Sequence, residues 1–482
     1  MELLSLYSVA IYVIILFCLS AFCIKKALNS YAEYGHCGRG LTFTYIAFTY
    51  LATWVGGGTI VGLVAQTYNA GAGQYWIFAI SCVVEFFFAL LFLKRIRKLQ
   101  VSSIAGFFAL RYPDYGEVIR IPVTTAVLIR NVTMTGMQFS AMAYMLTYLF
   151  DMNRNLAVLL IFLIITSYTI LSGLWGVVMT DIFQGILQTL AIILLMAFTV
   201  KLSGGIDEII SFFSATQNED FLNLLDFNQS TIGFIKYIIV FGLFFLMDDQ
   251  ANWVRIYSSK TEKVAFWGFI IPLIVTLIIL VIPTYFGVFQ RAYSAGGEEP
   301  QYVIYSFVFQ ALGLKVATII LVGLLASIMS SADSFMLASG SIFAEDIIKR
   351  FINKQANDKE MIFWTRAFVL ITGVIGFAFA IIISDIIHLW LSGIGMAAMI
   401  VLPPYFMAWF SKRVNTNGAV AGMIAGGCFC IAMTLGFIQN SVNLFLLGLI
   451  VNLGVTIIVS RLSKNPSQET IEKTYFFSKK FK

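Results

Sequence analysis

The segment Thr53-Trp54-Val55-Gly56-Gly57-Gly58-Thr59 places three consecutive glycines near the middle of an apolar run that covers residues 41–68. The run is long enough to cross a bilayer, but each glycine costs a helix about 1 kcal/mol relative to alanine. We therefore expect a transmembrane helix that unwinds near mid-membrane. Its freed carbonyls would need a cation, water or another protein group. The alternative is that the glycines let a second helix pack closely.

The composition indicates a polytopic membrane protein. Of the 482 residues, 59% are hydrophobic and 12% are charged, and the mean hydropathy is +0.88. Such a chain cannot bury its apolar residues in a water-soluble core. The net charge of +6 is assigned to cytoplasmic loops and carries no nucleic-acid signal. The cysteines and histidines show no metal-ligand spacing and no nucleophile-base pair appears, so we expect neither a cofactor nor an enzyme.

About thirteen helices are expected to span the membrane. The apolar spans fall at approximately 3–24, 41–69, 73–93, 118–149, 155–174, 177–200, 233–250, 264–289, 316–347, 361–384, 388–410, 418–438 and 441–460. Lysine and arginine concentrate in alternate connections, so the positive-inside rule predicts an outer N-terminus and a cytoplasmic C-terminus. The first run carries its lysines after the apolar stretch, unlike a signal peptide, and should remain as a helix. We expect one transporter domain, residues 1–482, in the plasma (inner) membrane.

The order of the spans suggests an inverted repeat. Five spans starting with the broken helix cover residues 41–200, and the next five cover 233–410 and begin from the opposite side of the membrane. The second group also opens on an interrupted helix, where residues 242–247 run into Asp248 and Asp249. Two inverted halves that each start with a discontinuous helix are typical of alternating-access transporters. The remaining parts are an extra helix at 3–24, two helices at 418–460 and a tail at 461–482.

The ninth span carries a row of serines. Ser327, Ser330, Ser331 and Ser334 follow the i, i+3, i+4, i+7 spacing, so they lie on one stripe of a helix. Their oxygens could converge on a cation beside the unwound segment. The alternative is that these hydroxyls join helices or bond to their own backbone.

Several motifs resemble the sodium:solute symporter family over nearly the whole chain, most closely its high-affinity choline transporter branch. The motifs lie at residues 52–58, 172–175, 180–184, 330–334, 343–344, 357–360 and 415–422. The resemblance implies a leucine-transporter-type fold with discontinuous first and sixth core helices. It also implies sodium, the only metal expected, bound by the carbonyls of Ala52, Val55 and Ser327 and by the hydroxyls of Ser330 and Ser331.

A second sodium is implied only by some relatives. In those symporters the acid that matches Asp181 works with hydroxyls of the serine stripe, here Ser330 and Ser334. This chain has Asp333 where some of these relatives have serine, which leaves the second ion open. Asp181 could instead lie in the favourable field of a helix N-terminus.

The expected solute is a small zwitterionic or carboxylate-bearing metabolite such as an amino acid. Trp54 matches an aromatic of the choline branch, but Met134 and Asp249 stand where that branch has tryptophans. Arg130, near mid-membrane, either pairs with Glu85 or holds a substrate carboxylate. The predicted substrate-binding residues are Trp54, Gly56, Thr59, Arg130, Met134, Phe245 and Asp249, with Phe245 also a candidate inner gate.

Sodium-coupled symport by alternating access is the expected function, with the monomer sufficient for transport. Choline or another quaternary amine is the alternative solute. A symporter-like sensor and a channel are the alternative classes. Arg255 matches a cytoplasmic arginine of the family and is expected to hold loops together.

Overall fold

The chain folds into a bundle of helices in a computed structural model that describes residues 2–225, 249–294, 297–383, 385–434 and 442–477. The α-helices are α1 (Glu2–Ala27), α2 (Tyr31–His36), α3 (Phe43–Trp54), α4 (Leu63–Ala70), α5 (Tyr75–Leu99), α6 (Ile104–Arg111), α7 (Arg120–Phe150), α8 (Arg154–Leu202), α9 (Ile206–Ala215), α12 (Gln250–Ser258), α13 (Glu262–Ile279), α14 (Val281–Tyr293), α15 (Val303–Ala311), α16 (Leu314–Phe343), α17 (Asp358–Ile382), α18 (Ile386–Phe410), α19 (Thr416–Thr434), α20 (Val442–Leu462) and α21 (Gln468–Thr474). Shorter turns of 3₁₀- or π-helix are η1 (Cys37–Arg39), η2 (Gly58–Gly62), η3 (Ala72–Gln74), η4 (Glu219–Leu222) and η6 (Ala344–Ile352). The all-helical prediction is confirmed.

The helix that contains the three glycines is broken. α3 ends at Trp54, Val55 leaves helical geometry with φ −89° and ψ 74°, and a π-helical turn begins at Gly58. The axes of the segments Phe43–Trp54 and Gly58–Ala70 differ by 47°. A side chain at Gly56 would overlap Ser331 Oγ, and one at Gly57 would lie 2.8 Å from the Ala141 side chain. The glycines therefore do both things that the sequence suggests: they interrupt the helix and they admit neighbouring helices.

Within the described residues, nine helices are long and apolar enough to span a membrane, or ten if the broken helix counts as one span. Part of the difference from thirteen arises in α8, where Gly173 (φ 54°, ψ −146°) joins two predicted spans without a loop. α7 covers the predicted span 118–149, but its polar residues make it less hydrophobic than the nine helices counted above. Most of the predicted span 233–250 lies outside the described residues, as do parts of the connection between α19 and α20.

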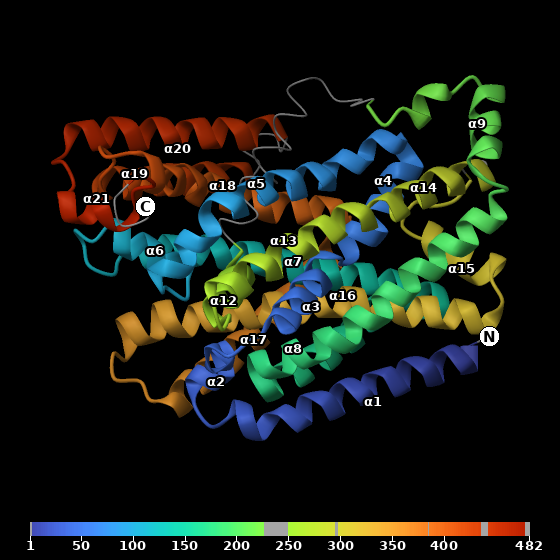
Figure 1. The fold of residues 1–482 in the computed structure, drawn as a ribbon, viewed down its shortest axis with the longest axis horizontal. Coiled ribbons are helices and arrows are strands. Elements are labelled where there is room, and N and C mark those ends of the chain that lie inside the picture. Colours follow the sequence, from blue (N-terminus) through green and yellow to red (C-terminus); the bar gives the residue numbers. More distant parts are fainter. Residues whose placement is uncertain (1, 226–248, 295–296, 384, 435–441, 478–482) are drawn as a thin grey trace.

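α16 occupies the centre of the bundle. It packs against α8, α7, α17 and α3, and all but a few of its residues are buried. α1 lies along one edge against α8, while α19 and α20 pair at the opposite edge (Figure 1). This arrangement places the serine stripe of α16 beside the C-terminal end of α3, deep inside the protein.

Candidate functional site

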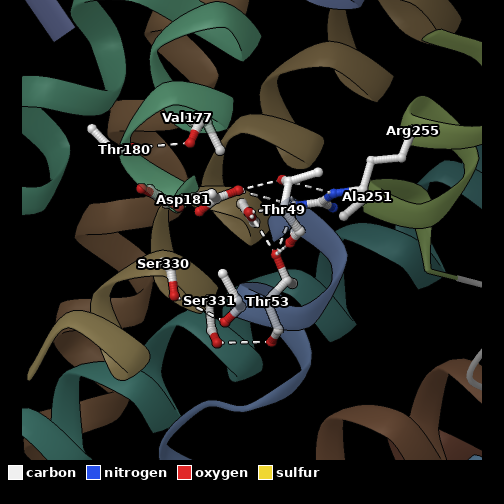
Figure 2. Close-up of polar contacts among 12 residues, drawn as sticks. Thr49, Thr53, Val177, Thr180, Asp181, Ala251, Arg255, Ser330 and Ser331 are labelled. Atoms are coloured by element: carbon white, nitrogen blue, oxygen red, sulfur yellow. Dashed lines mark hydrogen bonds and ion pairs between the residues drawn. The ribbon is translucent and has the colours of Figure 1, made fainter. Parts of the chain in front are cut away.

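The serines of α16 face the open end of α3. Ser330 Oγ donates to the Ala52 carbonyl at 2.9 Å, and Ser331 Oγ donates to the Thr53 carbonyl at 2.8 Å. Ser327 Oγ donates to the Val55 carbonyl. Figure 2 shows Ser330 and Ser331 reaching from α16 toward this end of α3. Carbonyls that lose their helical partners at the break therefore receive hydrogen bonds from another helix.

The structure brings together all five residues that the sequence analysis assigned to the first sodium. Ser330 Oγ also lies 2.9 Å from the Ser327 carbonyl, and Ser331 Oγ lies 3.4 Å from it. Ala52, Val55 and the three serines are fully buried. Several uncharged oxygens held this closely around one point form a set that suits a small hard cation. The hydroxyls can turn their hydrogens away and offer lone pairs instead.

The residues assigned to a second sodium do not share one site. Ser330 belongs to the cluster above. Asp333 Oδ2 accepts a hydrogen bond from Tyr168 OH at 2.8 Å. Asp181 and Ser334 surround the guanidinium of Arg255, which lies 3.7 Å from Asp181 Oδ2 and donates to Ser334 Oγ at 2.8 Å. The four residues proposed for a second sodium thus take part in three separate groups of contacts.

Arg255 differs from the expectation that it holds cytoplasmic loops together. Its side chain is 2% exposed and points into the bundle, where it also donates to Thr49 and Thr53 of α3 (Figure 2). The residue stands in the last turn of α12, whose N-terminus is capped by Asp249. Sequence reasoning missed this role because nothing local to α12 shows which helices surround it.

A small cavity lies beside the break. Its volume is about 30 Å³, room for one or two water molecules, so an organic solute fits only when the lining moves apart. The lining residues are Thr53, Trp54, Gly56, Gly58, Thr59, Phe78, Met134, Met137, Gln138, Phe335 and Trp390. Phe78 and Trp390 stack with their ring centroids 4.5 Å apart.

Four of the predicted substrate residues, Trp54, Gly56, Thr59 and Met134, line this cavity. Phe245, the candidate gate, lies outside the described residues. Three further aromatic residues of the lining, Phe78 of α5, Phe335 of α16 and Trp390 of α18, were not predicted, because no local motif identifies them. Three aromatic walls thus come from helices that are distant in the chain.

Arg130 and Asp249, the charged pair predicted to bind substrate, do not line the cavity. Arg130 Nη2 donates to Asp249 Oδ2 at 3.2 Å, and neither side chain is more than 2% exposed. Glu85, the alternative partner, accepts a hydrogen bond from Tyr50 OH at 2.7 Å. A buried guanidinium needs a nearby anion, and here Asp249, which caps the N-terminus of α12, supplies it; neither alternative predicted this pair.

Sequence comparison places these features in a known family. A family model described as the sodium:solute symporter family matches residues 34–426. The high affinity choline transporter 1 of Homo sapiens is 26% identical over 408 residues, which cover 81% of this chain and 68% of the transporter. The osmoregulated proline transporter of Bacillus subtilis is 24% identical over 475 residues, covering 96% of this chain and 95% of the transporter.

Solved structures show the same fold. A sodium-coupled sialic acid symporter in a substrate-bound outward-open state superposes with a TM-score of 0.82 at 17% identity, covering 96% of this chain and 99% of the symporter. A nucleobase-cation-symport-1 family transporter gives a TM-score of 0.60 at 13% identity, covering 92% and 98%. The predicted leucine-transporter-type fold is confirmed. The chain belongs to the sodium:solute symporter family and is a sodium-coupled secondary transporter rather than an enzyme.

Proposed function

We propose that this protein imports a small zwitterionic metabolite, such as an amino acid, together with sodium. One observation carries the sodium part of the proposal. The carbonyls of Ala52, Val55 and Ser327 and the hydroxyls of Ser330 and Ser331 converge at the break in α3. These oxygens are the proposed ligands of the coupling ion, which would enter as the hydroxyl hydrogens rotate outward.

The walls of the cavity support a zwitterion because they offer two kinds of surface. Trp54, Phe335 and Trp390 present aromatic rings, which attract an ammonium group through the negative charge on the ring face. The cavity is also lined by the start of the second half of the broken helix, at Gly56 and Gly58. A helix N-terminus carries partial positive charge and suits a carboxylate.

The pairing of Arg130 with Asp249 changes which residues we expect to bind the solute. Each side chain balances the charge of the other, so this pair adds little net charge near the cavity. The carboxylate is expected to bind the backbone at Gly56–Thr59 instead of the guanidinium. Choline is the second candidate, favoured by the aromatic walls alone, since it has an ammonium group but no carboxylate.

The proposed orientation has the N-terminus outside and the C-terminus in the cytoplasm, as the positive-inside rule predicts. The proposed repeats remain residues 41–200 and 233–410. A single chain contains every ligand named above, which supports transport by the monomer. Single cysteines introduced at Lys315, predicted to be outside, and at Lys412, predicted to be inside, test the orientation. A membrane-impermeant maleimide applied to intact cells is expected to label the first and not the second.

Uptake into proteoliposomes tests the function. With an inward sodium gradient, labelled L-proline or another small amino acid is expected to accumulate above its external concentration, and an ionophore that collapses the gradient should release it. Excess choline should not compete. Accumulation of choline that excess amino acids leave untouched would overturn the zwitterion proposal in favour of the second candidate. A channel would only equilibrate the solute, and a sensor would bind it without uptake, so both alternatives give distinct results.

A further inference from the structure

The tail segment, residues 474–477, docks onto the ends of α5 and α18. The Phe476 N–H donates to the Trp409 carbonyl at 2.8 Å, and Thr474 Oγ1 donates to the Ala408 carbonyl at 3.3 Å. The centroids of the Phe476 and Phe92 rings, the latter on α5, lie 5.1 Å apart. The preceding helix α21 packs on α6 at the end of the bundle marked C in Figure 1. Two carbonyls in the last turn of α18, which find no partner within a helix, are therefore satisfied by the tail segment.

Two cations lie against consecutive aromatic rings of the tail segment. The guanidinium carbon of Arg95 is 3.9 Å from the Phe476 ring centroid, and Lys412 Nζ is 5.1 Å from the Tyr475 ring centroid. Arg95 is partly exposed and Lys412 is exposed. Among the described residues neither cation forms an ion pair with an acid. Two positive charges that no acid neutralises are thus held on two neighbouring residues.

The sequence around both cations is strongly basic. The residues that we call the basic patch are Lys94, Arg95, Arg97, Lys98, Lys412 and Arg413. Neither residues 92–100 nor residues 410–418 contain an acid. Helix α21 adds Glu469 and Glu472, but Glu469 already pairs with Lys473 at 3.0 Å. Positive charge is therefore in excess where the tail segment docks.

The basic patch lies at the depth of lipid headgroups. The apolar spans of α5 and α18 end at Leu99 and Phe410, so Arg95 stands about one turn before the end of the first and Lys412 just after the second. Two apolar rings beside these cations face outward, since Phe410 is 43% exposed and Phe477 is 63% exposed. Basic side chains and aromatic rings at the boundary between hydrocarbon and water suit contact with anionic lipids.

We propose that Arg95, Lys412 and the tail segment form a binding site for the headgroup of an anionic lipid. The phosphate would contact the two cations, and the acyl chains would follow the exposed rings of Phe410 and Phe477 into the hydrocarbon. Phosphatidylcholine fits less well, because its choline group would place a further cation beside the basic patch. Phosphate free in water also fits less well, because it makes no use of the exposed rings. The proposed orientation puts this end of the bundle at the cytoplasmic leaflet, whose anionic lipids attract basic residues.

The two helices that hold the tail segment also build the solute cavity. At the cavity Phe78 of α5 stacks on Trp390 of α18, and near the tail segment the Phe92 ring of α5 lies 5.1 Å from the Trp409 ring of α18. These two contacts are about 20 Å apart along α5. A headgroup that holds the tail segment against both helices therefore fixes their spacing at one contact and affects the aromatic wall at the other. This link to solute binding rests on the proposed function, whereas the lipid site itself does not.

Thermal stability of the purified full-length protein in detergent micelles tests the lipid site without any solute. Phosphatidylglycerol is expected to raise the unfolding temperature, and phosphatidylcholine is not. The double variant Arg95→Gln with Lys412→Gln should need about 30-fold more phosphatidylglycerol for half of the maximal stabilisation. Arg95→Lys with Lys412→Arg keeps both charges and should behave like wild type. The matched control, Lys354→Gln with Lys359→Gln, removes two exposed charges between η6 and α17 and should also behave like wild type. The unfolding temperature without lipid shows that each variant is folded.

Three results would overturn the lipid site. They are equal stabilisation by the two lipids, an equal response of wild type and the glutamine double variant, and equal protection by glycerol 3-phosphate, which would indicate a site for a soluble anion.

Uptake of labelled L-proline into proteoliposomes tests the link to the cavity. Omitting phosphatidylglycerol should raise the KM several-fold for wild type but not for the glutamine double variant, whose KM should be high in either membrane. An unchanged KM for wild type would overturn the link. Absence of any uptake would contradict the proposed function and leave the stability result for the lipid site standing.

Discussion

Replacing Ser330 by alanine tests the sodium site most directly. Ser330 Oγ lies 2.9 Å from the carbonyls of both Ala52 and Ser327 and is fully buried, so no solvent can replace it without rearrangement. A hydrogen bond or contact to a charged group contributes about 1.5–3 kcal/mol. Loss of this ligand should therefore weaken sodium binding by about 10- to 150-fold.

Two measurements check this value: the sodium concentration that gives half-maximal uptake, and the concentration that gives half-maximal thermal stabilisation. The matched control is Ser339→Ala on the same helix. Ser339 is equally buried, but its hydroxyl donates to the Phe335 carbonyl of its own helix at 2.9 Å. The control should change sodium affinity by less than about twofold. Equal sodium affinity in the two variants would refute the assignment of Ser330 as a ligand.

Three further predictions address the break, the cavity and the turn η1 that precedes α3. Gly56→Ala should lower sodium affinity because its new methyl group overlaps Ser331 Oγ, whereas Gly427→Ala, which meets nothing within 4 Å, should leave sodium-dependent uptake unchanged. Trp390→Leu removes an aromatic ring from the cavity lining, so the KM for the solute should rise by about 30-fold (about 2 kcal/mol). The sodium affinity measured without solute should stay near the wild-type value. An unchanged KM would argue against an ammonium group bound at this ring. Burial raises the pKa of the Cys37 thiol well above its usual range. In a variant that keeps Cys37 alone, maleimide labelling should therefore keep accelerating between pH 8 and 10, where an exposed thiol of pKa about 8.5 levels off.

The break and the serine stripe could be predicted from the sequence because both depend on local rules. Consecutive glycines weaken a helix wherever they occur, and helical periodicity alone puts Ser327, Ser330 and Ser331 on one face. That the face meets the break follows from the family resemblance rather than from either pattern. The structure shows that these oxygens do lie together.

The charged residues were harder to predict because their partners are set by tertiary packing. Arg130 was expected to pair with Glu85 or with a substrate carboxylate, whereas its observed partner is Asp249, which was itself expected to bind substrate. Arg255 lies in α12, six residues after Asp249, yet its side chain contacts residues of three other helices, α3, α8 and α16. Phe335 and Trp390 come together at the cavity only because α16 and α18 both pack on α7. A single sequence contains no local signal for tertiary contacts of this kind.

The 47° bend after Trp54 has a consequence for how sodium binding and solute binding depend on each other. The upstream half of the helix ends with its negative pole beside the proposed sodium ligands, and the downstream half starts with its positive pole beside the cavity. A few residues of peptide between them thus serve as a hinge for both. Any change in the hinge angle alters both sites at once. A sodium ion that fixes this angle therefore orders the solute site before the solute binds.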